Sequence, residues 1–380
     1  MTIIIFIVLL TVLVFVHELG HFVSARQAGI RIEEFGLGLP PRLIGLQRHP
    51  GTGRLQLVAG FWSKRRPAAT TIYSFNLLPI GGFVKIFGED GVAERDPRSF
   101  ASQTWWVRVR TILAGVVMNT ALAIILLTIG FAAGTPIAAS KATNPQALTD
   151  IKIQIAFVAP NSPAAMAGFK AGDAIVELRH ANAVLEPKEI GEVQAFIGRF
   201  AGEPVTFTLV RGKAVSSLAI TPRVNPPAGE GAIGIAMEKT GVERLPLPAA
   251  LWQGATTAFA LVRDFAVALF DILARLFTRG RVPTELAGPI GIAAVVRDAS
   301  QLGFGYLLRL AAIISVNLAV INSLPIPALD GGRLLFLLIE KLKGSPVPRR
   351  AEQLAHSIGL ALLLFAIVAV SILDVQRWRL

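Results

Sequence analysis

The chain has 380 residues, no cysteine and a formal net charge of +12, with 53% hydrophobic and only 16% charged residues. This composition excludes a disordered chain, which would be polar and highly charged, and the lack of cysteine excludes a disulfide scaffold and a thiolate metal site. Charge this sparse argues against a single soluble globule and favours basic loops at a membrane surface over a nucleic-acid partner.

The first predicted element is a membrane-spanning helix over residues 1–25. Residues 2–16 carry no charge, and about 20 apolar residues cross a hydrocarbon core of roughly 30 Å. The second half of this helix contains His17, Glu18 and His21, which are costly in a bilayer and therefore indicate a function. The two histidines are four residues apart, so they share one helix face and can bind one metal ion, with Glu18 beside them.

Residues 26–107 form a basic loop, and residues 108–134 contain the second predicted span. Segment 26–110 holds 13 Lys or Arg against six Asp or Glu, whereas segment 136–247 is nearly balanced at eleven to ten. The connection 341–353 is basic again. The positive-inside rule therefore places both basic segments in the cytoplasm, and the N-terminus and residues 135–305 outside. The basic C-terminus argues mildly the other way.

The sequence pattern of residues 135–247 predicts a separate mixed α/β domain. Residues 151–158 alternate as a strand does, and the run from Asn161 to Leu178 reads as turn, short helix, turn and strand. This run resembles the core of bacterial PDZ domains, with Phe169 where leucine is usual. Residues 190–200 would then be the helix that flanks a peptide groove. The alternative is a small module that only separates the spans.

Residues 248–305 are apolar but interrupted by charges, and two further spans follow. Charged residues in this region favour an amphipathic helix on the membrane surface over a fifth span; they are Arg263, Asp264, Asp271 and Arg275. The third span is predicted within residues 306–340. Residues 341–380 contain a cytoplasmic connection and the fourth span.

A third metal ligand is expected near the end of the third span, because catalytic zinc usually takes three protein ligands and leaves one position for water. Asp330 is the best candidate, since the charge-based topology places it at the membrane depth of the histidine pair. Pro325 and Pro327 would break the helix just before it. Ordinary surface roles are expected for the remaining histidines, which are His49, His180 and His356.

Together these features resemble the bacterial site-2 proteases of the RseP/RasP type. The likeness rests on the motif from His17 to His21, on the motif from Asn322 to Gly332 and on the PDZ-like insertion, and it extends over nearly the whole chain. Weaker matches lie at 36–40, 78–85, Asn119 and 288–291. One departure is that a single PDZ-like repeat is found, where some members have two.

The resemblance implies the chemistry of the site. His17, His21 and Asp330 would bind Zn²⁺, and Glu18 would be the general base that assists attack by the zinc-bound water. Asn322 would help to position the substrate or stabilise the developing oxyanion. A membrane-associated β-hairpin in the cytoplasmic loop would hold the substrate in extended form through Gly82, Phe83, Val84 and Lys85.

We therefore expect a multi-pass α-helical protein of the bacterial inner membrane, with about four transmembrane helices and one inserted PDZ-like α/β domain on the extracytoplasmic side. It is expected to be a zinc metalloendopeptidase whose active site lies toward the cytoplasmic side. Its substrates would be single-pass transmembrane proteins, such as an anti-sigma factor or remnant signal peptides, and the PDZ-like domain would bind a peptide or substrate tail.

The sequence leaves two other function classes open. The first is a non-proteolytic membrane PDZ receptor with a structural zinc site, although such a site needs no base and usually closes all four positions. The second is a metal transporter, although transporters usually show two repeated halves and this sequence shows no such repeat.

Overall fold

The computed structural model describes residues 2–49, 51–59, 70–89, 95–142, 144–227, 229–279 and 288–378. The chain divides into two compact units. The membrane unit comprises Met1–Leu127, Leu251–Arg297 and Leu310–Leu380, and the sheet unit comprises Thr128–Ala250 and Asp298–Arg309.

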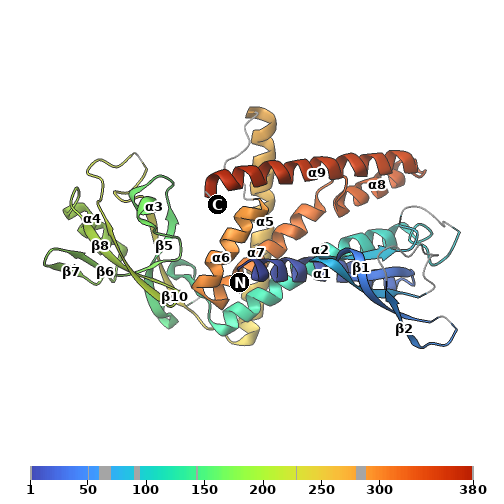
Figure 1. Ribbon diagram of the computed structural model, residues 1–380, viewed down its shortest axis with the longest axis horizontal. Helices are drawn as coiled ribbons and strands as arrows, with labels where there is room; N and C mark the ends of the chain where they lie inside the picture. Colours follow the sequence, from blue (N-terminus) through green and yellow to red (C-terminus); the bar gives the residue numbers. More distant parts are fainter. Residues whose placement is uncertain are drawn as a thin grey trace. The chain divides into compact units, whose positions relative to one another are not determined.

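Within the described ranges, four helices are long and apolar enough to cross a membrane. They are α1 (Thr2–Gln27), α2 (Trp105–Ala133), α7 (Phe304–Ser323) and α9 (Arg349–Trp378), drawn in Figure 1. All four are rich in Leu, Ile, Val and Ala and leave much of their surface exposed, as helices solvated by lipid do. These four candidate spans among the described residues fit a membrane protein, as the sequence predicts.

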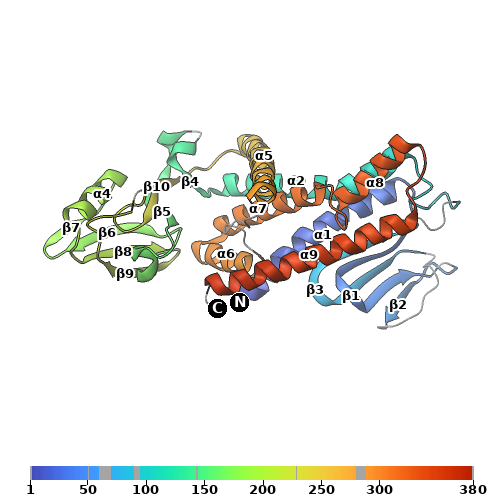
Figure 2. The ribbon, with the colours of Figure 1, turned by 90° about the horizontal axis from the view of Figure 1, so that it is seen from above.

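The helix α5 (Leu247–Arg279) is not among these candidate spans. In Figures 1 and 2 it crosses the direction of α1 and α9 instead of running with them. Its surface mixes exposed aromatic residues such as Trp252 and Phe270 with an exposed ion pair between Arg263 and Asp264. These features agree with an amphipathic interfacial helix, which stays a prediction. The next helix, α6 (Pro289–Leu302), follows in sequence.

The predicted third span, residues 306–340, is two helices rather than one. α7 ends at Ser323, and α8 (Asp330–Lys343) begins at Asp330. Pro325 and Pro327 lie between these two helices. Proline lacks the N–H that continues a helix, so both residues favour a break here. In this interval Ala328 has a positive φ of 80°. Asp330 therefore begins a new helix and does not end the spanning one.

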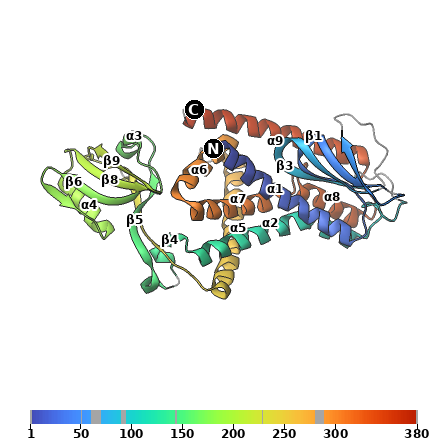
Figure 3. The same cartoon turned by 60° about the horizontal axis from the view of Figure 1, so that its bottom comes forward.

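A small sheet in the membrane unit lies against α1. Its strands are β1 (Ile32–Arg48), β2 (Leu55–Ala59) and β3 (Ile72–Ile86), in the order β2-β1-β3. Phe35 is opposite both Val84 and Tyr73, so the start of β1 lies between the two halves of β3. Thr11 Oγ1 on α1 donates to the carbonyl of Pro79 at 3.0 Å. This contact places the second half of β3 alongside α1 (Figure 3).

The sheet unit is a mixed α/β fold, visible in Figure 2. Its sheet has the order β4-β10-β5-β6-β8-β9, with β7 paired to β6. The strands are β4 (Pro136–Ala138), β5 (Thr149–Val158), β6 (Ala174–His180), β7 (Ala183–Leu185), β8 (Val205–Arg211), β9 (Ala214–Ile220) and β10 (Ile235–Val242). The helices α3 (Pro163–Ala167) and α4 (Ile190–Arg199) join them, and Val193 and Ile197 of α4 pack into the sheet core. The strand, short helix, strand and helix predicted from the sequence are all present.

A buried ion pair supports this unit, and we expect its loss to be costly. Asp173 is fully buried and binds Arg211 Nη2 at 2.7 Å, and this hydrogen bond raises the pKa of Arg211. Arg211→Ala leaves the carboxylate buried without its cation, with the Lys170 N–H still donating to it, so the sheet unit is expected to lose about 3 kcal/mol of stability. Hydrogen exchange of β6 and β8 amides in the full chain measures this loss.

The matched control for this prediction is Arg179→Ala. The pair between Arg179 and Glu177 is more exposed, so its removal is expected to cost less than about 1 kcal/mol. Equal protection of the two variants would show that the Asp173 pair does not stabilise the unit.

Candidate metal centre

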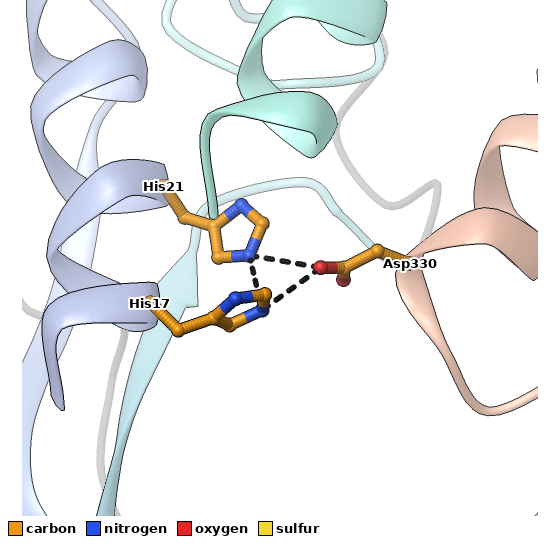
Figure 4. A group of neighbouring side chains, drawn as sticks. All are labelled: His17, His21 and Asp330. Carbon is orange, nitrogen blue, oxygen red and sulfur yellow. Dashed lines mark hydrogen bonds and ion pairs between the residues drawn. The ribbon is translucent and has the colours of Figure 1, made fainter. Parts of the chain in front are cut away.

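Three ligand atoms from distant parts of the chain converge in the membrane unit. His17 Nε2 lies 2.9 Å and His21 Nε2 3.2 Å from Asp330 Oδ2, and the two nitrogens are 3.2 Å apart. Figure 4 shows both imidazoles on consecutive turns of α1, facing the carboxylate across the gap between helices. Both histidines are buried. In the described part of the chain, these residues form the one group of His, Asp or Glu that could hold a metal ion.

The second ring nitrogen of each histidine determines which nitrogen is free for a metal. His21 Nδ1 donates to the backbone carbonyl of Thr111 at 2.8 Å, so Nε2 keeps its lone pair. His17 Nδ1 lies 3.4 Å from the side-chain amide of Asn119, which is fully buried. The structure has the amide nitrogen Nδ2 facing this ring; the opposite amide orientation, in which Asn119 Oδ1 accepts the Nδ1 proton, would leave Nε2 of His17 free as well. The orientation of both rings is therefore set from α2.

Gly115 on α2 gives the two imidazoles their space. A Cβ at this position would lie 2.5 Å from His21 Nε2 and 2.6 Å from His17 Cε1. Those distances are shorter than any van der Waals contact, so a larger residue displaces the rings.

We expect Gly115→Ala to weaken metal binding strongly while the helices remain in place. The added methyl group pushes on both ligand rings, so metal affinity is expected to fall by about 10–100-fold, as when ligand orientation is disturbed. Metal content after dialysis against a chelator measures the effect. Gly130→Ala on the same helix is the control, because its Cβ comes no closer than 3.3 Å to the Thr135 side chain. Equal metal retention in both variants would contradict the steric argument.

Glu18 lies next to the ligand pair and is tied to the small sheet. Its Oε2 accepts a hydrogen bond from the backbone N–H of Val84 at 3.1 Å. One carboxylate oxygen is therefore held by β3, and no described residue hydrogen-bonds to the other, which leaves it able to take a proton. This bond also joins two elements that the sequence predicted separately, the helix of the histidine motif and the strand from Gly82 to Lys85.

The residues predicted to bind the substrate lie on β3 and near the end of α7. Gly82 and Phe83 lie beside Val84 on β3, and Lys85 pairs with Glu33 at 2.7 Å. Asn322 is half-buried near the end of α7. Among the described residues, no hydrogen bond links its side chain to the three ligands, so its role stays a prediction.

Two contacts around the site were not anticipated from the sequence. Arg333, one helical turn after Asp330, forms an ion pair with Glu89, and burial raises the pKa of the Glu89 carboxyl. The expectation of an ordinary surface role for His356 was wrong, because its Nδ1 accepts from the backbone N–H of Ala328 at 2.8 Å. No sequence signal pointed to either contact, since both depend on how α8 and α9 pack.

Comparison with known proteins identifies the family. The model of peptidase family M50 matches residues 5–59 and 56–366. The chain belongs to peptidase family M50. A relative from Nostoc sp., named as a zinc metalloprotease, is 33% identical over 94% of this chain and 91% of its own length. Zinc metalloprotease RasP of Geobacillus kaustophilus is 28% identical over the whole chain and 99% of its own length.

Membership in M50 confirms the site-2 protease family, the enzyme class and the zinc cofactor predicted from the sequence. As an M50 zinc metalloprotease with apolar spans, the protein works in the lipid bilayer on membrane-protein substrates. The three ligand atoms fit zinc: metal–ligand distances of about 2.0–2.1 Å put the corners of a tetrahedron about 3.3 Å apart. The observed separations of 2.9 to 3.2 Å match one face of such a tetrahedron.

Proposed function

We propose that this M50 protease hydrolyses peptide bonds within the transmembrane segments of single-pass proteins. His17, His21 and Asp330 bind the zinc ion, and Glu18 is the general base. The observation that carries the proposal is the triangle formed by His17 Nε2, His21 Nε2 and Asp330 Oδ2, between α1 and the start of α8. Glu18 directly follows His17 in α1. Such a group inside apolar helices is costly unless it is used.

The chemistry divides between the metal and the chain. Zinc, when bound, acts as a Lewis acid on water and on the scissile carbonyl. Glu18 takes a proton from the attacking water and passes it to the leaving amide nitrogen. The Val84 N–H holds Oε2 of this carboxylate at 3.1 Å, which fixes the direction of the second oxygen. Asn322 would position the substrate carbonyl or stabilise its developing charge.

The substrate must be unwound before it is cut, because every carbonyl of a transmembrane helix is hydrogen-bonded within the helix. The second half of β3, which runs beside α1 up to Glu18, offers main-chain groups to an extended segment. Gly82, Phe83, Val84 and Lys85 form this stretch. Strand addition there replaces hydrogen bonds lost on unwinding.

Water reaches the site from the side of the basic loop. A cavity of about 560 Å³ is lined by charged side chains of α2, α8 and α9, including Arg108, Arg333 and Glu340. Ile112 also lines this cavity. The backbone carbonyl of its neighbour Thr111 accepts the hydrogen bond from His21 Nδ1. With residues 26–110 in the cytoplasm by the positive-inside rule, the cavity opens to that side, and the sheet unit is extracytoplasmic.

The sheet unit acts as a PDZ-like peptide-binding domain in this proposal. β10 pairs with β5 along most of its length, but β4 covers only the part from Thr240 to Val242. The uncovered edge faces α4, whose N-cap residue Glu189 forms an ion pair with Lys239 of β10. A peptide can add a strand between β10 and α4.

A pair of labelled peptides tests this role of the sheet unit. If the groove binds a substrate tail by its free carboxylate, an otherwise identical amidated peptide is expected to bind about tenfold more weakly. Fluorescence polarisation with the full chain in detergent measures both affinities. No binding of either peptide would leave the sheet unit as a spacer.

Cleavage of a tagged single-pass protein in liposomes tests the proteolytic function. We expect a cut within the span, lost on adding a zinc chelator and restored by zinc. The second candidate, a PDZ receptor with a structural zinc site, requires a closed metal site, whereas three ligands are found among the described residues. One bound zinc per chain with no cleavage of several truncated substrates would favour the receptor.

A further inference from the structure

The last helix, α9, contacts the loop that carries the metal-binding carboxylate. The loop, residues 324–329, joins α7 to α8 and ends directly before Asp330. The backbone N–H of Ala328 donates to Nδ1 of His356 at 2.8 Å. Three residues further along α9, Gly359 packs so closely that a Cβ there would overlap the carbonyl oxygen of Pro327. Two consecutive residues of the loop are therefore held by one helix.

The conformation of the loop needs this support. Ala328 has a φ of 80°, in a region that residues with a Cβ rarely adopt and that persists only where the surroundings compensate. Its N–H cannot join a helix, because α7 has ended and α8 has not begun. The imidazole of His356 supplies the acceptor that this N–H would otherwise lack.

His356 also contacts the chain on the other side of Asp330. Its ring lies 5.6 Å, centre to centre, from that of Phe336, which belongs to α8. One side chain thus touches the residue two positions before the carboxylate and a residue on the helix that the carboxylate begins. Contacts on both sides define where Asp330 lies relative to α1.

We propose that His356 is a positioning residue for the zinc site. By accepting the Ala328 N–H through Nδ1, it holds the loop so that Asp330 Oδ2 lies 2.9 Å from His17 Nε2 and 3.2 Å from His21 Nε2. The inference rests on the proposed role of Asp330 as a zinc ligand. It assigns to α9 a part in the metal centre, although α9 contributes no ligand.

Zinc release from the full chain in detergent tests the inference. The rate of transfer to a chromophoric chelator is measured, together with the d–d absorption of the cobalt-substituted protein, which reports ligand geometry. His356→Leu fills the space without an acceptor and is expected to release zinc about tenfold faster or more, with an altered cobalt spectrum. His356→Asn places an amide oxygen near the position of Nδ1 and is expected to release zinc close to the wild-type rate.

Two further variants complete the comparison. Leu360→Ala changes an exposed residue of the same helix and is expected to behave as wild type. Gly359→Ala leaves His356 intact but pushes α9 away from Pro327, so it is expected to release zinc faster. Circular dichroism checks that each variant keeps its helices, and the glycine variant provides an independent test where His356→Leu does not fold.

The outcomes separate this inference from the proposed ligand set. Wild-type zinc release in both His356→Leu and Gly359→Ala, with zinc lost in Asp330→Ala, would overturn the inference and leave the Asp330 assignment intact. Equally fast release in the Leu and Asn variants would overturn the role of the acceptor. Full zinc retention in Asp330→Ala would overturn the ligand set and this inference with it.

Discussion

Glu18→Gln is expected to lower the rate of intramembrane cleavage by about 10²–10⁴-fold while zinc stays bound. The amide cannot take the proton from the attacking water, but it keeps the shape of the side chain and an oxygen for the Val84 N–H. Because Glu18 is outside the ligand triangle, the metal content is expected to stay at one zinc per chain. Single-turnover cleavage in liposomes, with zinc measured on the same sample, gives both quantities.

The control for this variant is Glu186→Gln, the same chemical change at an exposed position of the sheet unit. It is expected to cleave at the wild-type rate. A Glu18→Gln protein that cleaves as fast as wild type would place the base elsewhere, and one that loses zinc would show that Glu18 supports the metal and not the proton transfer.

Asp330→Ala is expected to lose both zinc and activity. Two imidazoles remain, and without the carboxylate the metal loses its charged ligand. Disturbing residues around a metal site already costs about 10–100-fold in affinity, so removal of a ligand is expected to cost more. Metal content after dialysis against a chelator measures the loss.

Asp264→Ala is the matched control, because Asp264 is an exposed carboxylate on α5 that pairs with Arg263. It is expected to keep zinc and activity. If Asp330→Ala binds zinc as tightly as wild type, the third ligand lies elsewhere and the geometry in Figure 4 does not describe the bound site.

The spans and the histidine motif could be predicted from the sequence because their signals are local. An uncharged stretch of suitable length predicts a spanning helix, and His17 and His21 four residues apart must share a helix face. Asp330 is 313 residues away from His17, yet charge counting placed it at a similar depth. The break before Asp330 followed from two prolines, although the sequence did not show that a new helix begins there.

The surroundings of the ligands could not be predicted in this way. Nothing local in Gly115 or His356 shows that one faces the imidazoles and the other binds the loop before Asp330. Both facts depend on the rotation of one helix against another, which apolar residues on every side leave undetermined. The hydrogen bond between Glu18 and Val84 likewise required the path of β3 along α1.

The separation of the ligands along the chain has a consequence for biosynthesis. The helix with the histidine pair is made first, and the carboxylate follows 313 residues after His17. At about 5–20 residues per second, the ribosome needs roughly 15–60 s to cover that distance. With Asp330 as the third ligand, as proposed, the growing polypeptide lacks a complete ligand set throughout this interval. Under the proposed ligand set, completion of the catalytic site is timed by translation itself, and a chain truncated before Asp330 is expected to be inactive.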